Sequence, residues 1–554
     1  MVCAVPPHPT APAGNTATGA TPTTDLENAP RITIETGRLS GSLSLLGGRI
    51  DDLRLKDYNE TINDGSPIVT LLIPEGQTGA YYGLHGWAPT AGVDPALVPG
   101  SKTLWSTNDT NLSVGAPVTL TWDNGAGQRF QRDISIDENY MFSITQTVTN
   151  TSAAPITIAP YGIIARHGEP ADLQGFFILH EGMVRMNDGE LDYTKYGNMP
   201  DYDVDPKEGA PAEAVKVTET GWIGLTDHFW MTTLIPNGPF KSVSKYNPTR
   251  DMYITEAVAT TRTIAPGETI QVGSRFFAGA KEWEAIRAYQ NQGGIDRFVD
   301  SIDWGWFAWL TKPIFMLLHW LNGLIGNMGW AIIGLTLIIK ALLLPLAYKS
   351  YVSMARMKEL QPEMEKLKER AGDDRQKMQQ GMMELYKKNK VNPASGCLPI
   401  LLQIPIFFSL YKVIFVTLEL RHAPWFGIFQ DLSAPDPTSI MNLFGLLPWG
   451  APEPGSIMAL ILIGILPLLL GISMWIQQKL NPAPTDPTQA MIFAWMPWVF
   501  MFMLGTFASG LIVYWIANNT ITFTQQYLIM RSQGIKPDVF GNILSSFKRG
   551  KKDG

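Results

Sequence analysis

The stretch MGWAIIGLTLIIKALLLPLAY, residues 328–348, decides the fold of the second half of this chain. It is long enough to cross a bilayer as a helix, which needs about 20 apolar residues. It also contains one cation, Lys340, and Thr336 lies one helical turn earlier on the same face. A lysine at the centre of a span opposes insertion by about 2.5 to 3.5 kcal/mol, and such charges usually face a bundle interior or a watery cavity. The stretch therefore predicts a membrane helix that lines a polar cavity.

Lys340 has an alternative explanation, in which its aliphatic stem carries the ammonium to the membrane interface. That arrangement is common for lysines near the ends of a span, whereas Lys340 has apolar residues on both sides. Thr336 also gives the same stripe a second polar group. We therefore favour the inward-facing position and keep the interfacial one open.

Composition divides the 554-residue chain into two unlike halves. The net charge of -7 and the hydrophobic content of 45% describe no single class of protein. Most acidic groups precede residue 300, where no apolar run could span a membrane, and long apolar blocks follow residue 305. The 2 cysteines, Cys3 and Cys397, lie in different halves, which excludes a disulfide framework and a cysteine-based zinc site. The pattern predicts a soluble domain fused to a membrane domain, with no metal and no cofactor.

Residues 1–25 are rich in Pro, Thr, Ala and Gly, as in PPHPTAPAGNTATGATPTT at 6–24. Such a segment cannot bury enough apolar surface to fold, so we predict a disordered linker. No charged and apolar leader and no spanning helix comes before it. We therefore expect that an anchor helix precedes Met1 in the natural protein, or that export of the next domain depends on another signal.

Residues 26–300 are predicted to form one large β-sandwich with a C-terminal helix. Short alternating runs such as RITIETGRLSGSLSLLGGRI (31–50) and ETIQVGSRFFAG (268–279) are separated by Gly, Asn, Asp and Pro. This pattern is typical of antiparallel strands, and about 250 residues of it fit a single all-β domain. His85, His167 and His180 leave open a sugar-processing site, but they have no fixed spacing and fit ordinary loop or core positions better.

Tryptophans gather directly after this domain, in WGWFAWLTKPIFMLLHWLNGLIG at 304–326. Tryptophan favours the headgroup layer of a membrane. Lys312, His319 and Asn322 supply polar groups for the wet face. Residues 301–326 are therefore predicted to form an amphipathic helix that lies in the membrane interface.

The membrane core is predicted to cover residues 327–531. After 328–348, four more candidate spans follow, at 397–418, 457–476, 489–507 and 510–530. The segment 349–391 is rich in Lys and Arg, whereas 420–456 has only Arg421. The positive-inside rule therefore locates 349–391 and the basic tail 532–554 in the cytoplasm, and the β domain on the other side.

The cytoplasmic segment 349–391 is predicted to form a helical hairpin, with Gly372 at the turn and an Asp cap after it. Flexible methionines recur along it and could meet varied apolar partners. They could equally hold the two helices of the hairpin together, and both uses are compatible. The methionines concerned are Met354, Met357, Met364, Met378 and Met382.

Polar residues recur at helical spacing inside the later spans. Gln403 lies in the second span, and Asn519, Thr522 and Gln526 follow Trp515 along one face of the last. Such side chains often form hydrogen bonds between helices, for about 0.6 to 2 kcal/mol each. Together with Thr336 and Lys340 they also make a polar groove plausible.

Several segments resemble a known family, the YidC/Oxa/Alb insertases that place proteins into membranes. The resemblance covers most of the chain, including the β domain, which is similar to the periplasmic domain of the Gram-negative bacterial YidC type. It implies a β-supersandwich akin to sugar mutarotases, a five-helix membrane core and no enzymatic activity. The most specific segments are NPASGCLPILLQIPIFFSLYKVIF (392–415), ELRHAPWFGIFQDLSAPDP (419–437), DPTQAMIFAWMP (486–497) and FASGLIVYWIANNTITFTQQYLI (507–529).

The resemblance also implies a hydrophilic groove that opens to the cytoplasm and lipid and is closed to the outside. Lys340 matches the cation of this groove, often an arginine in the family, and Thr336 and Gln403 would line the groove beside it. The cation attracts acidic residues of a substrate's outward-going segment while the apolar span slides into lipid. Residues implied to touch the nascent helix are Phe407, Leu470, Met503, Tyr514 and Trp515.

The expected function is therefore a membrane protein insertase and folding chaperone of the bacterial inner membrane. Expected partners are nascent membrane proteins, the Sec translocon with its accessory subunits, the lipid bilayer, and the ribosome through the basic tail and hairpin. No specific nucleic-acid sequence is expected. The alternative is a polytopic transporter or channel with a charged site, although matched halves with broken helices are not evident.

Overall fold

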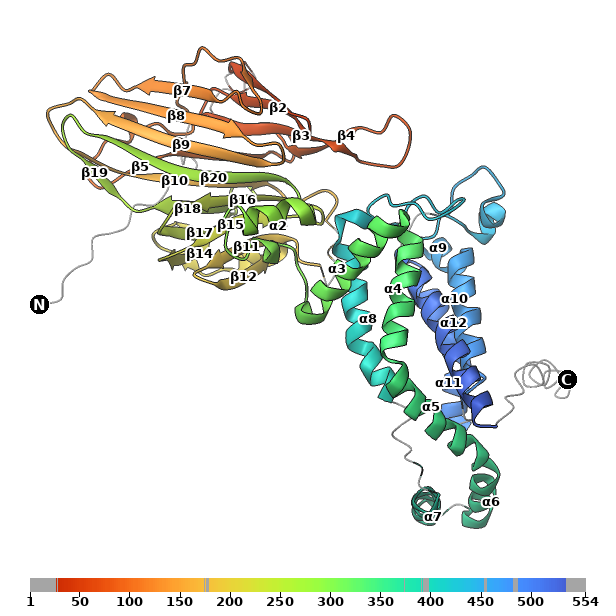
Figure 1. The fold of residues 1–554 in the computed structure, drawn as a ribbon. Coiled ribbons are helices and arrows are strands. Elements are labelled where there is room, and N and C mark those ends of the chain that lie inside the picture. The colour runs from red at the N-terminus through yellow and green to blue at the C-terminus, as the bar shows by residue number, and fades with distance from the viewer. Residues whose placement is uncertain are drawn as a thin grey trace, which may run out of the picture. The chain divides into compact units, whose positions relative to one another are not determined.

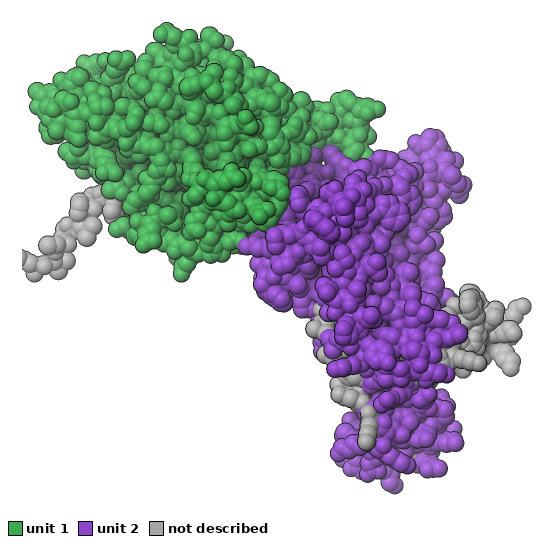
Figure 2. Space-filling view, in the orientation of Figure 1, with its two compact units in different colours: residues 1–303 green, residues 304–554 purple. Residues whose placement is uncertain are grey.

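The computed structural model describes residues 26, 28–173, 175, 179–372, 374–389, 391, 398–452, 456–481 and 487–534. The chain forms two compact units, residues 1–303 and 304–554, shown as ribbons in Figure 1 and in green and purple in Figure 2. The first unit is rich in β-strands and the second is helical, which confirms the predicted fold class. The predicted linker 1–25 and most of the predicted basic tail lie outside the described residues.

The larger sheet of the first unit has 12 strands. Its strands are β1 (Arg31–Glu35), β2 (Leu39–Ser44), β3 (Arg49–Asn59), β4 (Ile68–Leu72), β5 (Tyr81–Pro89), β6 (Asn111–Leu112), β10 (Ile156–His167), β13 (Val204–Asp205), β14 (Ala210–Val217), β17 (Phe240–Asn247), β18 (Met252–Ala259) and β19 (Arg262–Ile264). Their order is β13-β14-β17-β18-β10-β5-β3-β2-β1-β6, with β19 beside β10 and β4 beside β3. The β1–β6 pair is parallel, which differs from the antiparallel pairing that the sequence predicts.

The smaller sheet has 8 strands, in the order β12-β11-β15-β16-β20-β9-β8-β7. They are β7 (Val118–Asp123), β8 (Gln128–Ile136), β9 (Met141–Asn150), β11 (Gly182–Asn187), β12 (Glu190–Lys195), β15 (Gly221–Thr226), β16 (Trp230–Pro236) and β20 (Thr269–Ala280). Strand β9 shows the expected alternation, because buried residues alternate with more exposed ones along most of the strand.

The two sheets pack face to face through alternate residues of β5. A Cβ added at Gly83 would lie 2.7 Å from Cζ of Phe276 on β20, and the His85 ring also contacts Phe276. Because successive side chains of a strand point to opposite faces, Tyr82 and Leu84 face away from the smaller sheet. The larger sheet is therefore covered with apolar side chains on both of its faces.

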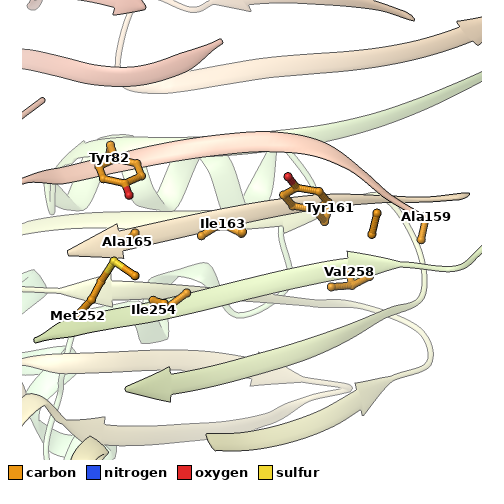
Figure 3. Close-up of a cluster of buried hydrophobic side chains, with 9 residues drawn as sticks. Tyr82, Ala159, Tyr161, Ile163, Ala165, Met252, Ile254 and Val258 are labelled. Carbon is orange, nitrogen blue, oxygen red and sulfur yellow. The ribbon is translucent and has the colours of Figure 1, made fainter. Parts of the chain in front are cut away.

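Figure 3 shows the buried cluster on that second face. Tyr82, Tyr161, Ile163 and Ile254 belong to it, and they come from the neighbouring strands β5, β10 and β18. A cavity of about 530 Å³ lies against these residues, and the segment from Pro95 to Leu104 contributes to its wall.

Helix α2 (Trp283–Asn291) is tied to both sheets by its N-cap residue, Glu282. The Glu282 carboxylate accepts hydrogen bonds from the hydroxyls of Tyr58 and Tyr140 and forms an ion pair with Arg38. Tyr58 lies on β3 of the larger sheet, and Tyr140 immediately precedes β9 of the smaller one. This single carboxylate therefore links the two layers of the sandwich at one end.

The second unit is built around a long C-terminal helix. Its helices are α3 (Ala308–Ile325), α4 (Met328–Leu342), α5 (Leu344–Glu359), α6 (Gln361–Ala371), α7 (Arg375–Lys388), α8 (Leu398–Val416), α9 (Ile457–Ile461), α10 (Ile465–Gln478), α11 (Pro487–Leu504) and α12 (Ser509–Ser532). Helix α12 contacts α4, α5, α8 and α10, so four helices meet on it.

The helix that contains Lys340 ends at Leu342, and α5 begins after one intervening residue, Leu343. Pro345 lies in the first turn of α5. A proline inside a helix lacks the N–H donor and its ring clashes with the carbonyl four residues earlier. The break at Leu343 removes this conflict and bends the chain by 68°.

Within the described part of the chain, no single helix combines the length and the mean hydropathy of a bilayer span. The bent pair α4 and α5 satisfies both criteria together, and shorter apolar helices run from Gln403 to Val416, Ile465 to Gln478 and Thr488 to Leu504. The predicted span 328–348 thus includes the break at Leu343, and the predicted span 457–476 includes the break between α9 and α10.

Gly224 provides a test of the close approach between β15 and β16. A Cβ at this position would lie 1.9 Å from the carbonyl oxygen of Thr232, whereas a Cβ at Gly37 meets nothing within 4 Å. Gly224→Ala should lower the free energy of unfolding of the β unit by about 1 to 3 kcal/mol. The measurement is the midpoint of urea unfolding of the full chain in detergent, with near-ultraviolet circular dichroism as the signal. Gly37→Ala is the matched control, and equal midpoints for the two variants would contradict the packing.

Candidate functional site

Lys340 lies in the last turn of α4, just before the break, and its side chain is half-buried. Its ammonium donates a hydrogen bond to Oε1 of Gln403 on α8 across 3.1 Å. Gln403 in turn donates from Nε2 to the hydroxyl oxygen of Tyr514 on α12 across 2.5 Å. A continuous chain of three polar side chains therefore joins α4, α8 and α12.

The partner of the Lys340 ammonium carries no charge. Among the described residues, no Asp or Glu forms an ion pair with Lys340. An ammonium has three donors, of which Gln403 accepts from one, and a carboxylate would add a charge–charge attraction that the neutral amide oxygen does not supply. The arrangement therefore holds a positive charge at a fixed place and leaves it able to bind an anionic group.

Two further contacts fix the backbone around Lys340. Gln525 of α12 donates from Nε2 to the backbone carbonyl of Lys340 across 3.3 Å. Thr336 is buried, and its hydroxyl donates to the carbonyl of Ile332 in its own helix at 2.7 Å. Sequence reasoning missed Gln525, although it follows Tyr514 by about three helical turns on the same face of α12.

The other predicted polar residues of α12 have partners other than Lys340. Asn519 donates to the hydroxyl of Ser473 on α10 across 3.1 Å, and Gln526 donates to the side-chain oxygen of Asn481 across 3.2 Å. Both are buried, as is Thr522 on the same stripe. The structure thus divides the polar residues of α12 between a face near Lys340 and a face that bonds to α10 and to Asn481 just after it.

Three of the five predicted apolar contact residues lie together. The rings of Phe407 and Trp515 have centroids 4.9 Å apart, and Trp515 also contacts the Tyr514 ring. Leu470 is fully buried in α10, whereas Met503 on α11 is 50% exposed. The aromatic group therefore borders the polar chain directly, because Tyr514 belongs to both.

The hairpin of α6 and α7 turns at Gly372, which has φ +55°. Asp374 caps α7 by accepting hydrogen bonds from the backbone N–H groups of Gln376 and Lys377, each at 3.1 Å. Met357, Met364 and Met382 belong to the apolar cluster of the hairpin, and Met354 and Met378 are half-buried. Met383, which sequence reasoning did not single out, is the strongly exposed methionine of α7.

The three histidines considered for a sugar-processing site contact three different aromatic side chains. The His85 ring contacts Phe276, that of His167 contacts Tyr82, and that of His180 contacts Tyr193. Burial lowers the pKa of His85 to about 3 and the pKa of His180 to about 4, so both are neutral at physiological pH. No group of three potential metal ligands occurs in the described residues.

Comparisons with known proteins cover nearly the whole chain. Residues 31–317 match the family model described as the YidC periplasmic domain, and residues 320–536 match that of the 60Kd inner membrane protein. The membrane protein insertase YidC of Roseobacter denitrificans is 71% identical over 96% of this chain and 88% of its own length. That of Ruegeria pomeroyi is 67% identical over 98% of this chain and 91% of its own length.

Solved structures give two further likenesses. A crystal structure of an active YidC insertase with its first transmembrane domain resolved has a TM-score of 0.36 and 17% identity, over 90% of this chain and 94% of that chain. A galactose mutarotase related enzyme from Lactobacillus acidophilus has a TM-score of 0.30 and 10% identity, over 45% of this chain and 97% of that chain.

The family models and the identities define an insertase of the inner membrane with a periplasmic β domain, a class of protein that is not enzymatic. The chain belongs to the YidC family of membrane protein insertases.

His85 should make the stability of the β unit dependent on pH. The ordinary histidine pKa is 6.5, and the folded-state pKa of His85 is about 3. Between these values the unfolded chain binds a proton that the folded chain does not. The free energy of unfolding should therefore fall on acidification, by up to about 1.4 kcal/mol per pH unit. The urea midpoint should shift between pH 7.5 and pH 5, and this shift should be smaller in His85→Gln than in the unsubstituted chain. An equal shift in the two chains would show that His85 does not cause the pH dependence.

Proposed function

We propose that the protein inserts nascent membrane proteins, alone or with the Sec translocon, by drawing acidic outward-going segments to the Lys340 ammonium. The groove that receives these segments is formed by α4, α8 and α12 around Lys340, Gln403 and Tyr514. The observation that supports the proposal is the neutral partner of Lys340, since an amide oxygen does not neutralise the charge of the ammonium and leaves two of its three donors for a carboxylate. No covalent chemistry is required.

The groove lowers the energetic cost of moving a polar segment through the membrane. Burying an unpaired polar group in an apolar medium costs several kcal/mol, and burying a lone charge costs more. A water-filled half-channel shortens the apolar path, and Lys340 offers a countercharge at the deepest point of that path. The break after α4 supports this role, because the helix with the cation ends there and the chain changes direction.

The apolar span of the substrate leaves beside the aromatic group of Phe407 and Trp515. This group adjoins the polar chain through Tyr514, so one substrate can meet a polar and an apolar surface together. The exposed Met503 lies on α11 and would face lipid or a departing substrate helix. The proposed five-helix core consists of α4 with α5, α8, α9 with α10, α11, and α12.

The orientation follows from charge. Residues 349–391 carry many lysines and arginines and the segment 420–456 carries Arg421 alone, so the hairpin and the C-terminus are assigned to the cytoplasm. In this orientation the basic hairpin faces the ribosome and the exposed Met383 is available to apolar segments that emerge from it. Contacts with the Sec translocon and its accessory subunits belong to the same proposal.

The test is an insertion assay in cells depleted of their own insertase. This chain, with an added N-terminal anchor helix, is supplied with Lys340 unchanged or with Lys340→Arg, Lys340→Ala or Lys340→Glu. The substrate is a small membrane protein with an acidic outward-going segment. Lys and Arg should support insertion at equal expression, and Ala and Glu should reduce it about tenfold, which corresponds to about 1.4 kcal/mol.

The matched control reverses the charge of the substrate. A substrate whose outward-going segment carries lysines in place of the acidic residues should be inserted better by Lys340→Glu than by the unsubstituted chain. If the unsubstituted chain and the three variants at position 340 insert both substrates equally, Lys340 has a structural role only and the proposal is wrong.

A further inference from the structure

The stretch 436–449, which lies between α8 and α9, buries polar side chains and exposes many of its apolar ones. Its polar residues Asp436, Thr438, Ser439 and Asn442 are buried, whereas many of its large apolar side chains are exposed. In water, a loop normally exposes polar groups and covers apolar ones. We call residues 437–452 the apolar loop. Its exposed large apolar side chains are Ile440, Met441, Leu443, Leu446 and Trp449.

The buried polar residues attach the apolar loop firmly to the start of α10. Asp436 accepts a hydrogen bond from the backbone N–H of Leu466 across 2.8 Å, and the hydroxyl of Thr438 accepts one from Ile465 across 2.8 Å. The Ser439 hydroxyl donates to the carbonyl of Leu462 across 2.6 Å. The apolar side chains are therefore exposed on a segment that hydrogen bonds hold in place.

The apolar loop also satisfies many of its own hydrogen-bonding groups. The side-chain oxygen of Asn442 accepts hydrogen bonds from the backbone N–H groups of Ser439 and Gly445, at 2.8 and 2.9 Å. The indole N–H of Trp449 donates to the carbonyl of Met441 across 2.9 Å. A segment that lies in lipid must satisfy its polar groups internally in this way.

Backbone strain accompanies the outward direction of the apolar side chains. Leu443 and Phe444 both have positive φ, at 50° and 58°, a region that residues other than Gly, Asn and Asp seldom adopt. Such strain persists only where the surrounding structure imposes it. The contacts of Ser439 and Asn442 at the start of this turn supply that constraint.

Exposed apolar side chains also occur on α9. Ile457, Met458 and Ile461 are exposed there, and Leu446 and Ile457 reach 79% and 77% exposure. No charged residue occurs in 437–452 or in 456–478. In Figure 1 the loop beside α9 lies at the end of the helical unit opposite α6 and α7.

We propose that the apolar loop inserts its side chains into the lipid of the outer leaflet and anchors the outer end of the helical unit there. The assignment to the outer leaflet rests on the orientation proposed above, whereas lipid contact rests on the loop alone. A protein partner fits less well, because protein interfaces carry a polar rim and about one hydrogen bond per 100 to 200 Å². The described residues 437–452 of the apolar loop carry no charge, and its indole donor is already used.

The test measures the depth of the loop in a membrane. Cys3 and Cys397 are replaced by serine, and Leu446→Cys is labelled with a nitroxide in the full chain, reconstituted into vesicles of phosphatidylethanolamine and phosphatidylglycerol. Relaxation by oxygen, which concentrates in lipid, is compared with relaxation by a water-soluble nickel chelate. Leu337→Cys, on the exposed side of α4, is the lipid reference, and Val204→Cys, on β13, is the water reference. Ile457→Cys repeats the measurement if Leu446→Cys does not fold.

The label at position 446 should resemble that at position 337, with strong relaxation by oxygen and weak relaxation by the chelate. A label that resembles position 204 would overturn the proposal, because the loop would then be in water. A label protected from both reagents would also overturn it and would indicate a protein contact. Neither outcome depends on insertion activity, so failure here is distinct from failure of the role of Lys340.

Discussion

One ammonium group in an apolar helix is the constraint on which the helical unit depends. A charge removed from water costs several kcal/mol unless hydrogen bonds or water compensate for the loss. Gln403 of α8 accepts from Lys340 and is itself bonded to Tyr514 of α12, while Gln525 of α12 holds the carbonyl of Lys340. These contacts bring three helices together around a charge for which the described residues provide no carboxylate.

Helix α12 connects this charge to the rest of the unit because its two polar faces have different partners. On one face, Gln525 bonds to Lys340 and Tyr514 reaches it through Gln403. On the other face, Asn519 bonds to Ser473 of α10 and Gln526 bonds to Asn481 just after α10. Interhelical hydrogen bonds of this kind contribute about 0.6 to 2 kcal/mol each. Movement of α12 would therefore disturb the position of the cation and the packing of α10 together.

The sequence predicts the parts of this site better than their arrangement. Lys340 could be recognised because a lone cation in an apolar run is rare, and Pro345 signals the break that divides the predicted span 328–348. Helical spacing grouped Asn519 and Gln526 with Lys340, but the rotation of α12 that turns them to α10 depends on tertiary packing. Gln403 could be recognised as a polar residue inside an apolar span, but only the resemblance placed it beside Lys340. The outward-facing Leu443 and Leu446 were missed because their direction depends on buried contacts of Asp436 and Asn442.

The most direct measurement asks whether water from the cytoplasmic side reaches position 340. In a chain without Cys3 and Cys397, Lys340→Cys is treated with a membrane-impermeant maleimide in inside-out and right-side-out vesicles. Leu337→Cys, at a position that is 56% exposed on α4, is the apolar comparison position one turn earlier on the same helix. Position 340 should be labelled only in inside-out vesicles, and position 337 should be labelled in neither. Failure to label position 340 in either orientation, in protein that folds, would contradict a water-filled groove around the cation.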